Sequence, residues 1–278
     1  MLVMDGLQQE AGWHLQWDGG IIRMPTKFPA LACDTHAHIF EARFPYSKER
    51  IYTPPDSTLT DYKHLLKTLG CERAVLVQPS VYGDDNAAML DALAAGGPGF
   101  RAVAVTQPDV SDAEIEKLHR AGVRGLRFNV VDRRENKNQI PADMLRSVAR
   151  RIAARGWHIE LLVQLDEAGD FAPLLGKLGL AVVIGHLGYP KGLAKTWTQT
   201  RAFSDLLRLL DGDQCWIKLT GPYRITSEAD MPYSDVTDPA RRLIAHAPHR
   251  MIWGTDWPHV MKKKPMANDG DMTDLLDQ

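Results

Sequence analysis

The sequence predicts a (β/α)₈ barrel, in which eight parallel strands alternate with helices. Eight short runs, several of them almost continuously apolar, are typical of parallel strands buried on both faces. Between these runs lie segments with apolar residues at helical spacing. An open doubly wound sheet is the alternative, but it usually has fewer strands, and no Gly-x-Gly-x-x-Gly motif follows the first run.

The expected elements alternate along the whole chain. The predicted strands are Leu31–Thr35, Arg73–Gln78, Arg101–Val105, Val123–Phe128, His158–Val163, Ala181–Ile184, Cys215–Leu219 and Arg250–Trp253. The predicted helices are Asp61–Leu69, Asn86–Ala95, Asp112–Ala121, Ala142–Arg155, Asp166–Leu178, Thr198–Leu210 and Asp238–Ala247. Ser111 is a suitable N-cap for the third helix. Left-handed C-caps are expected at Gly70, Gly122, Gly156, Gly179 and Gly212.

We expect one barrel domain over residues 31–278, preceded by an N-terminal extension of residues 1–30, because no repeat or shift of composition marks a second domain. Only Gly254–Gln278 follow the last predicted strand. Within them Asp271–Gln278 could begin an eighth helix but is too short to cover the barrel. Either the chain continues beyond this point, or a partner covers that face.

Composition narrows the class of protein. A net charge of -2 gives no long-range attraction to nucleic acid or anionic membrane, so neither is an expected partner. The first residues do not resemble a signal peptide, and no stretch approaches the length of a membrane span. Three widely spaced cysteines favour the reducing cytoplasm over a disulfide scaffold. The oligomeric state is left open.

The first strand ends in Asp34-Thr35-His36-Ala37-His38. In an extended segment, residues two apart point to the same side, so His36 and His38 are expected to face the barrel mouth together. Such a pair can bind a metal ion or polarise a carbonyl group by hydrogen bonding.

Two further candidates follow later strands. His186 comes two residues after the apolar run that ends at Ile184, where barrel enzymes carry active-site residues. Asp256 follows the last strand, and a carboxylate there is costly to bury unless it is paired or used. Near histidines it can accept a proton from water as a general base.

Five segments carry a family resemblance. They are Asp34–Phe40, Val77–Ser80 with Asp85-Asn86, Gly125–Asn129, Gly185–Gly188 and Trp253–His259. Together they resemble the amidohydrolase superfamily, and within it the branch of 2-pyrone-4,6-dicarboxylate lactonase, sugar-acid lactonases and lactone isomerases. The resemblance runs from about Leu31 to the C-terminus in the family's motif order. Members usually continue past the end of this chain with a closing helix.

The resemblance implies roles for individual residues. The catalytic group is His36, His38, His186 and Asp256. It implies that the aspartate activates the attacking water while the histidines assist it and polarise the lactone carbonyl, without a metal. The positions that match substrate-binding residues are Tyr52, Ser80, Arg127, Arg133, Arg224 and His259. Arginine suits this task because its planar fork meets a carboxylate with two hydrogen bonds.

At two positions the sequence departs from the pyrone lactonase pattern, and these departures bear on the identity of the substrate. Leu162 stands where the pyrone lactonase has a tyrosine, and Tyr189 stands where it has an arginine. The loss of one carboxylate-binding arginine puts the pyrone dicarboxylate itself in doubt as the substrate. Metal-dependent relatives usually add a histidine on the fifth strand, where this chain offers Gln164, and arginine on the fourth strand cannot ligate zinc.

We therefore expect a hydrolase that opens a small carboxylated lactone with no cofactor. Alternatives within the enzymes are a lactone isomerase, a decarboxylase, and a zinc-dependent hydrolase in which His36, His38, His186 and Asp256 hold one zinc. The alternative outside the enzymes is a barrel that only binds a small molecule. An aspartate placed with three histidines argues against this last alternative, because a site that merely binds an anion would avoid a carboxylate.

Overall fold

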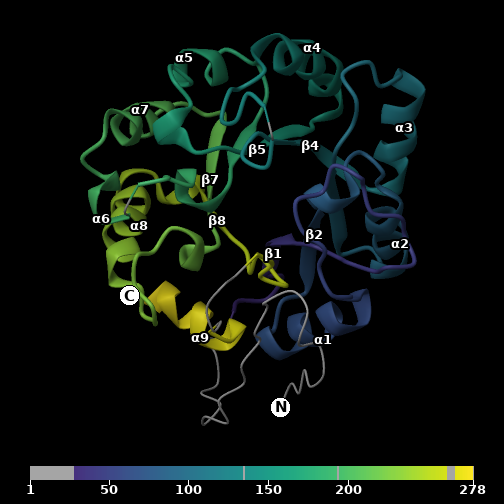
Figure 1. The fold of residues 1–278 in the computed structure, drawn as a ribbon, viewed down its shortest axis with the longest axis horizontal. Coiled ribbons are helices and arrows are strands. Elements are labelled where there is room, and N and C mark those ends of the chain that lie inside the picture. The colour runs from purple at the N-terminus through teal and green to yellow at the C-terminus, as the bar shows by residue number, and fades with distance from the viewer. Residues whose placement is uncertain (1–27, 134, 193, 262–266, 278) are drawn as a thin grey trace.

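The computed structural model describes residues 28–133, 135–192, 194–261 and 267–277, and its fold is the predicted barrel (Figure 1). Eight parallel strands form one sheet in chain order, with helices around it. The strands are β1 (Cys33–Ala37), β2 (Arg73–Val77), β3 (Phe100–Ala104), β4 (Val123–Asn129), β5 (His158–Leu162), β6 (Val182–Ile184), β7 (Cys215–Leu219) and β8 (Met251–Trp253). Each overlaps its predicted strand.

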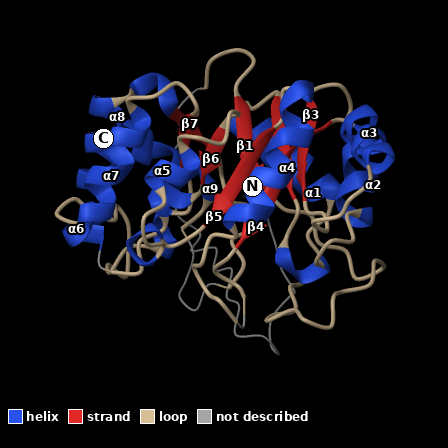
Figure 2. Ribbon diagram, turned by 90° about the horizontal axis from the view of Figure 1, so that it is seen from above, coloured by secondary structure: helices blue, strands red, loops and turns tan. Residues whose placement is uncertain are grey.

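The helices pack against the outside of the strands (Figure 2). They are α1 (Leu59–Leu69), α2 (Ala87–Gly96), α3 (Asp112–Ala121), α4 (Ala142–Ile152), α5 (Ala172–Leu175), α6 (Ala194–Trp197), α7 (Arg201–Leu210), α8 (Ser234–His246) and α9 (Asp269–Thr273). Helix α1 shows why the pattern succeeds, because its apolar residues at helical spacing, from Tyr62 to Leu69, are all buried.

The prediction of a long helix over Asp166–Leu178 is wrong. The structure has only a 3₁₀ turn at Leu165–Glu167 and the four residues of α5. Gly169 lies between them in the left-handed region and breaks the helical path. The C-cap expected at Gly212 is also wrong, because α7 ends on Asp211 in the right-handed conformation and Gly212 has no positive φ.

The C-terminal segment supplies a short closing element. Helix α9 is N-capped by the Asn268 side chain and is followed by a 3₁₀ turn at Asp274–Asp277. Met272 of α9 is buried and joins the main core. The predicted N-terminal extension lies almost wholly outside the described residues. No helix in the described part of the chain has the length and apolar character needed to cross a membrane.

The seam between β1 and β8 is closed by the chain that follows β8. The backbone N–H of Asp256 donates to His36 O at 2.8 Å, and that of His38 donates to Trp257 O at 2.9 Å. Gly254 makes this approach possible, since a Cβ atom there would lie 2.7 Å from the backbone nitrogen of His36. The seam therefore holds Asp256 beside the histidines of β1.

Buried Asp34 ties the two sides of the seam together. Its Oδ1 accepts from the backbone N–H groups of His36 at 3.0 Å and Thr255 at 2.9 Å. Its Oδ2 accepts from the hydroxyls of Tyr62 at 2.9 Å and Thr255 at 2.6 Å. One side chain thus serves four donors from three parts of the chain.

Replacement of Asp34 by alanine is expected to lower the free energy of unfolding by about 3 kcal/mol or more, because several buried donors lose their acceptor. Urea titration followed by circular dichroism measures the change. Thr68→Ala, which removes one hydroxyl bonded locally to His64 O on α1, is the control and should cost little. Equal stability of the two variants would show that the seam does not depend on Asp34.

Candidate functional site

A cavity of about 310 Å³ lies at the carboxyl ends of the strands, where loops follow β1, β2, β4, β6, β7 and β8. Seven of the ten predicted site residues line it: His38, Tyr52, Ser80, Arg127, His186, Arg224 and Asp256. Because parallel strands end on the same face of a barrel, residues far apart in the sequence meet there.

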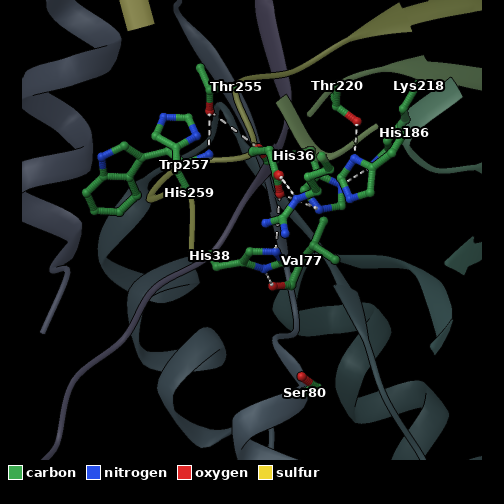
Figure 3. A network of polar contacts seen from close by, with 12 residues as sticks. His36, His38, Val77, Ser80, His186, Lys218, Thr220, Thr255, Trp257 and His259 are labelled. Carbon is green, nitrogen blue, oxygen red and sulfur yellow. Dashed lines mark hydrogen bonds and ion pairs between the residues drawn. The ribbon is translucent and has the colours of Figure 1, made fainter. Parts of the chain in front are cut away.

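Two histidines come from the end of β1. Their rings meet edge to face with centroids 4.9 Å apart, and both side chains are buried. His38 Nδ1 lies 2.7 Å from the carbonyl oxygen of Val77, a contact drawn in Figure 3. A carbonyl can only accept, so Nδ1 carries the proton and the His38 Nε2 lone pair is left for the site.

His186 follows β6 in a left-handed conformation, with a φ of 49°. Its Nδ1 lies 2.7 Å from Thr220 Oγ1 (Figure 3), and its ring centroid lies 5.2 Å from that of His36. A non-glycine residue with positive φ is strained and is common at active sites, where the surrounding structure enforces it.

Asp256 also has a positive φ, 63°, and its two carboxylate oxygens differ in environment. Oδ2 accepts from the Tyr223 hydroxyl at 2.5 Å and from Arg224 Nε at 2.6 Å. Oδ1 is buried without a hydrogen-bond partner, 3.6 Å from His36 Nε2 and 3.8 Å from His38 Nε2. One oxygen is held in place, and the other faces the histidines.

The charges of this cluster follow from burial and from its neighbours. Burial alone would raise the pKa of the Asp256 carboxyl, but the Arg224 guanidinium and the histidines hold that pKa well below its usual range. Burial lowers the pKa of His186 to about 3 and also lowers the pKa values of His36 and His38. At neutral pH the site therefore holds an ionised carboxylate and three neutral imidazoles.

Arg127 brings positive charge to the cavity wall. It is 6% exposed, and Nη1 donates to the backbone oxygen of Gln78 at 2.7 Å. Its Nε has no partner, and no carboxylate of the described residues forms an ion pair with it. A buried guanidinium without a counter-ion favours an anionic ligand.

Three predicted residues lie away from the cavity lining. Arg133 is exposed. His36 is not among the residues that line the cavity, and its Nε2 lies 3.6 Å from Asp256 Oδ1, which does line it. His259 is buried with Nδ1 at 3.2 Å from the Tyr223 hydroxyl and Nε2 at 2.9 Å from Asp269 Oδ1. Roles for Arg133 and His259 in substrate binding stay predictions.

Sequence reasoning missed several polar residues of this site, among them Asp132, which lines the cavity, and three residues beside the catalytic cluster. Tyr223 contacts Asp256, and Glu160 of β5 and Lys218 of β7 form an ion pair next to His36. For the last two a signal was present, because each is the one charged side chain within an otherwise apolar part of its strand. Such a residue has to be paired or used when the strand is buried. Tyr223 lies in a turn without a distinctive pattern.

One set of side chains in the described part of the chain has the spacing of a metal site. Ligand atoms of His36, His186 and Asp256 lie within 4.8 Å of one another. Two fixed cations oppose a divalent ion there. Lys218 Nζ lies 3.0 Å from His36 Nδ1, and the Arg224 guanidinium already neutralises Asp256. The set therefore does not fit a metal ion well, although its spacing would allow one.

The fold and the site together are those of a (β/α)₈-barrel hydrolase. Its family follows from comparison with known sequences: residues 33–278 match the Amidohydrolase family, and the chain belongs to that family.

Several relatives of 30% identity or more are named as lactone hydrolases or as a lactone isomerase. The chain is 36% identical to a 2-pyrone-4,6-dicarboxylate hydrolase of Comamonas testosteroni over 98% of its own length and 91% of the relative. It is 31% identical to a D-galactarolactone isomerase of Agrobacterium fabrum over 88% of its length and 82% of the relative. A solved structure from Pseudomonas putida, named as a candidate 2-pyrone-4,6-dicarboxylic acid hydrolase, superposes with a TM-score of 0.77 at 30% identity, covering 90% of both chains.

Proposed function

We propose that this protein hydrolyses a small carboxylated lactone, with water activated by Asp256 and without a metal ion. The single observation that carries the proposal is the free Oδ1 of Asp256, which is ionised and faces two histidines at the base of a cavity. A buried carboxylate oxygen without a donor is costly unless a water or a substrate group fills the gap.

The proposed reaction has two steps. The oxygen of water attacks the lactone carbonyl carbon while one proton of that water passes to Asp256 Oδ1. The carbonyl oxygen becomes an oxyanion, which the Nε2–H of a neutral histidine can stabilise. The ring C–O bond then breaks, and the ring oxygen leaves and takes up the proton. The product is an open acid that bears a hydroxyl group.

We propose that Arg127 recognises the negative charge of the substrate. Its guanidinium, whose Nε has no hydrogen-bond partner, is the expected partner of a substrate carboxylate, with the Ser80 and Tyr52 hydroxyls on the same cavity wall. Tyr189 and Leu162, the two departures from the pyrone lactonase, also line the cavity. We therefore propose that the substrate carries one carboxylate near Arg127 and need not carry a second.

Lactone isomerisation is the second candidate, favoured by the D-galactarolactone isomerase among the relatives. A panel of sugar-acid and pyrone lactones, assayed for acid release with and without a chelator, separates these reactions. Hydrolysis releases one acid per lactone, isomerisation changes the lactone without net acid, and a binding protein turns over neither. Loss of activity with chelator, restored by zinc, would overturn the metal-free proposal. The cytoplasmic location expected from the cysteines is likewise part of the proposal.

The rate of lactone opening is expected to stay level from about pH 5 to 8, without an inflection near the ordinary histidine pKa of about 6.5. Burial lowers the pKa of His186 to about 3 and also lowers the pKa values of His36 and His38, while the pKa of Asp256 is held well below its usual range, so none of these groups is expected to titrate near pH 6.5. The measurement is kcat/KM against pH under constant ionic strength. A bell-shaped profile with a limb near pH 6.5 would show instead that one of these histidines titrates during turnover.

A further inference from the structure

Glu160 and Lys218 form an ion pair inside the barrel, underneath the catalytic cluster. Lys218 Nζ lies 2.6 Å from Glu160 Oε2, and the two residues are 2% and 1% exposed. They come from β5 and β7, which are not neighbours in the sheet, so their side chains meet across the barrel interior. Burying two charges is costly, and a pair of apolar residues of similar volume often serves stability as well. The pair therefore calls for an explanation beyond packing.

The contacts of Lys218 account for every proton of its ammonium group. An ammonium has three N–H donors and no acceptor. Nζ has three acceptors within reach: Thr35 O at 2.7 Å, Glu160 Oε2 at 2.6 Å and His36 Nδ1 at 3.0 Å. His36 Nδ1 is thus the third acceptor and has to offer a lone pair. A neutral imidazole with a bare Nδ1 carries its proton on Nε2.

Glu160 Oε1 offers the competing arrangement, because it lies 3.3 Å from the same His36 Nδ1. A proton on Nδ1 could point to that oxygen, but it would then lie against the ammonium at 3.0 Å, and two positive N–H groups would face each other. The contact of His36 Nδ1 with the ammonium is shorter than its contact with Glu160 Oε1, and the ammonium would repel an N–H group at Nδ1. Both observations favour a lone pair on His36 Nδ1. Glu160 then acts by holding the ammonium in place.

His38 is fixed in the opposite way. Its Nδ1–H donates to Val77 O, which leaves a lone pair on Nε2. The Nε2 atoms of both histidines approach the same free oxygen of Asp256, at 3.6 and 3.8 Å. One histidine therefore presents a hydrogen-bond donor to the site and the other presents an acceptor.

We propose that Lys218 and Glu160 are positioning residues that fix His36 as the Nε2–H tautomer. His36 then acts as the hydrogen-bond donor of the site, and His38 acts as the acceptor. This inference rests on the proposed lactone hydrolysis. His36 Nε2–H donates to the carbonyl oxygen as it becomes an oxyanion, while His38 Nε2 accepts a hydrogen bond from the O–H that the water keeps after Asp256 has taken its first proton. The same proton on His36 Nε2 removes the lone pair that a metal ion would need from this residue.

The first test uses the unmodified protein and no substrate. Long-range ¹H–¹⁵N correlation spectra of histidine-labelled protein report which ring nitrogen is protonated, and His36→Gln and His38→Gln assign the two rings by loss of signal. We expect Nε2–H for His36 and Nδ1–H for His38. A proton on Nδ1 of His36 would overturn the proposal. This readout does not depend on turnover, so it fails independently of the proposed reaction.

The second test removes the ammonium. In Lys218→Met the His36 Nδ1–H can turn to Glu160 Oε1, so we expect the tautomer to switch. Loss of an oxyanion donor should lower kcat by about a hundredfold, while KM changes little because Arg127 is untouched. Zinc content after dialysis against the metal should rise. Lys67→Met, which removes an exposed lysine of α1, is the matched control.

Two outcomes separate positioning from a structural role. If Lys218→Met does not fold, the double variant Glu160→Leu with Lys218→Met removes both charges beside His36 Nδ1, so that only Asp256 Oδ1, 3.6 Å from Nε2, still acts on the tautomer. A mixture of both His36 tautomers is then expected. The Nε2–H form retained alone in either folded variant would overturn the proposal, as would a kcat equal to that of Lys67→Met.

Discussion

Asp256→Asn is expected to lower kcat for lactone opening by roughly a hundredfold or more, the usual size of a general-base contribution. Asparagine keeps the shape, and its oxygen can still accept from Tyr223 and Arg224, but the amide group that faces His36 and His38 cannot take a proton from water. KM should change little, because the guanidinium of Arg127 remains in the cavity wall. The measurement is steady-state kinetics at one pH within the level part of the profile.

Tyr223→Phe is the matched control, since it removes a donor to Asp256 Oδ2 and leaves the free oxygen unchanged. We expect it to lose much less activity than Asp256→Asn. Near wild-type turnover by Asp256→Asn would exclude the proposed mechanism. If that variant instead loses a tightly bound zinc together with its activity, the metal-dependent mechanism is the better account.

Arg127→Met is expected to weaken the binding of a carboxylated lactone by about 2–5 kcal/mol, the range for removing one partner of a buried charge pair. Methionine keeps much of the apolar stem and removes only the cation. The effect should appear mainly in kcat/KM for lactones that bear a carboxylate.

An uncharged lactone of the same ring size is the internal control for Arg127→Met, because it has no carboxylate to lose. Arg124→Met is the matched variant: Arg124 is on the same strand, but its guanidinium donates to the backbone oxygens of His119 and Val123 and does not line the cavity. If Arg127→Met lowers kcat/KM equally for the charged and the uncharged lactone, Arg127 supports the structure of the site and does not bind a substrate carboxylate.

The barrel and the catalytic cluster could be predicted because both depend on short-range patterns. Apolar runs of five or so residues identified the strands, and polar residues at their carboxyl ends had to share one face of a parallel barrel. His36, His186 and Asp256 come together for that reason. The family resemblance added the roles, which residue types alone left open.

The residues and elements that the sequence did not predict correctly have physical reasons for the difference. The position of Arg133 is set by a loop, for which no periodicity constrains the direction of a side chain. His259 turns towards Asp269 on α9, a contact that depends on tertiary packing. The pairing of Glu160 with Lys218 crosses the barrel interior, and sequence spacing carries no information on that distance. The helix predicted over Asp166–Leu178 is too long because apolar residues keep helical spacing on both sides of Gly169, whose left-handed conformation interrupts the helical path.

The seam held by Asp34 also orders the steps by which the enzyme becomes active. Asp34 and Thr255 are 221 residues apart, and contacts so distant in sequence form late because the intervening chain must first be ordered. The same seam places Asp256 against His36. We therefore expect a nascent chain to acquire its catalytic centre only as the two ends of the sheet join. Incompletely closed molecules would then be inactive even with most of their strands in place.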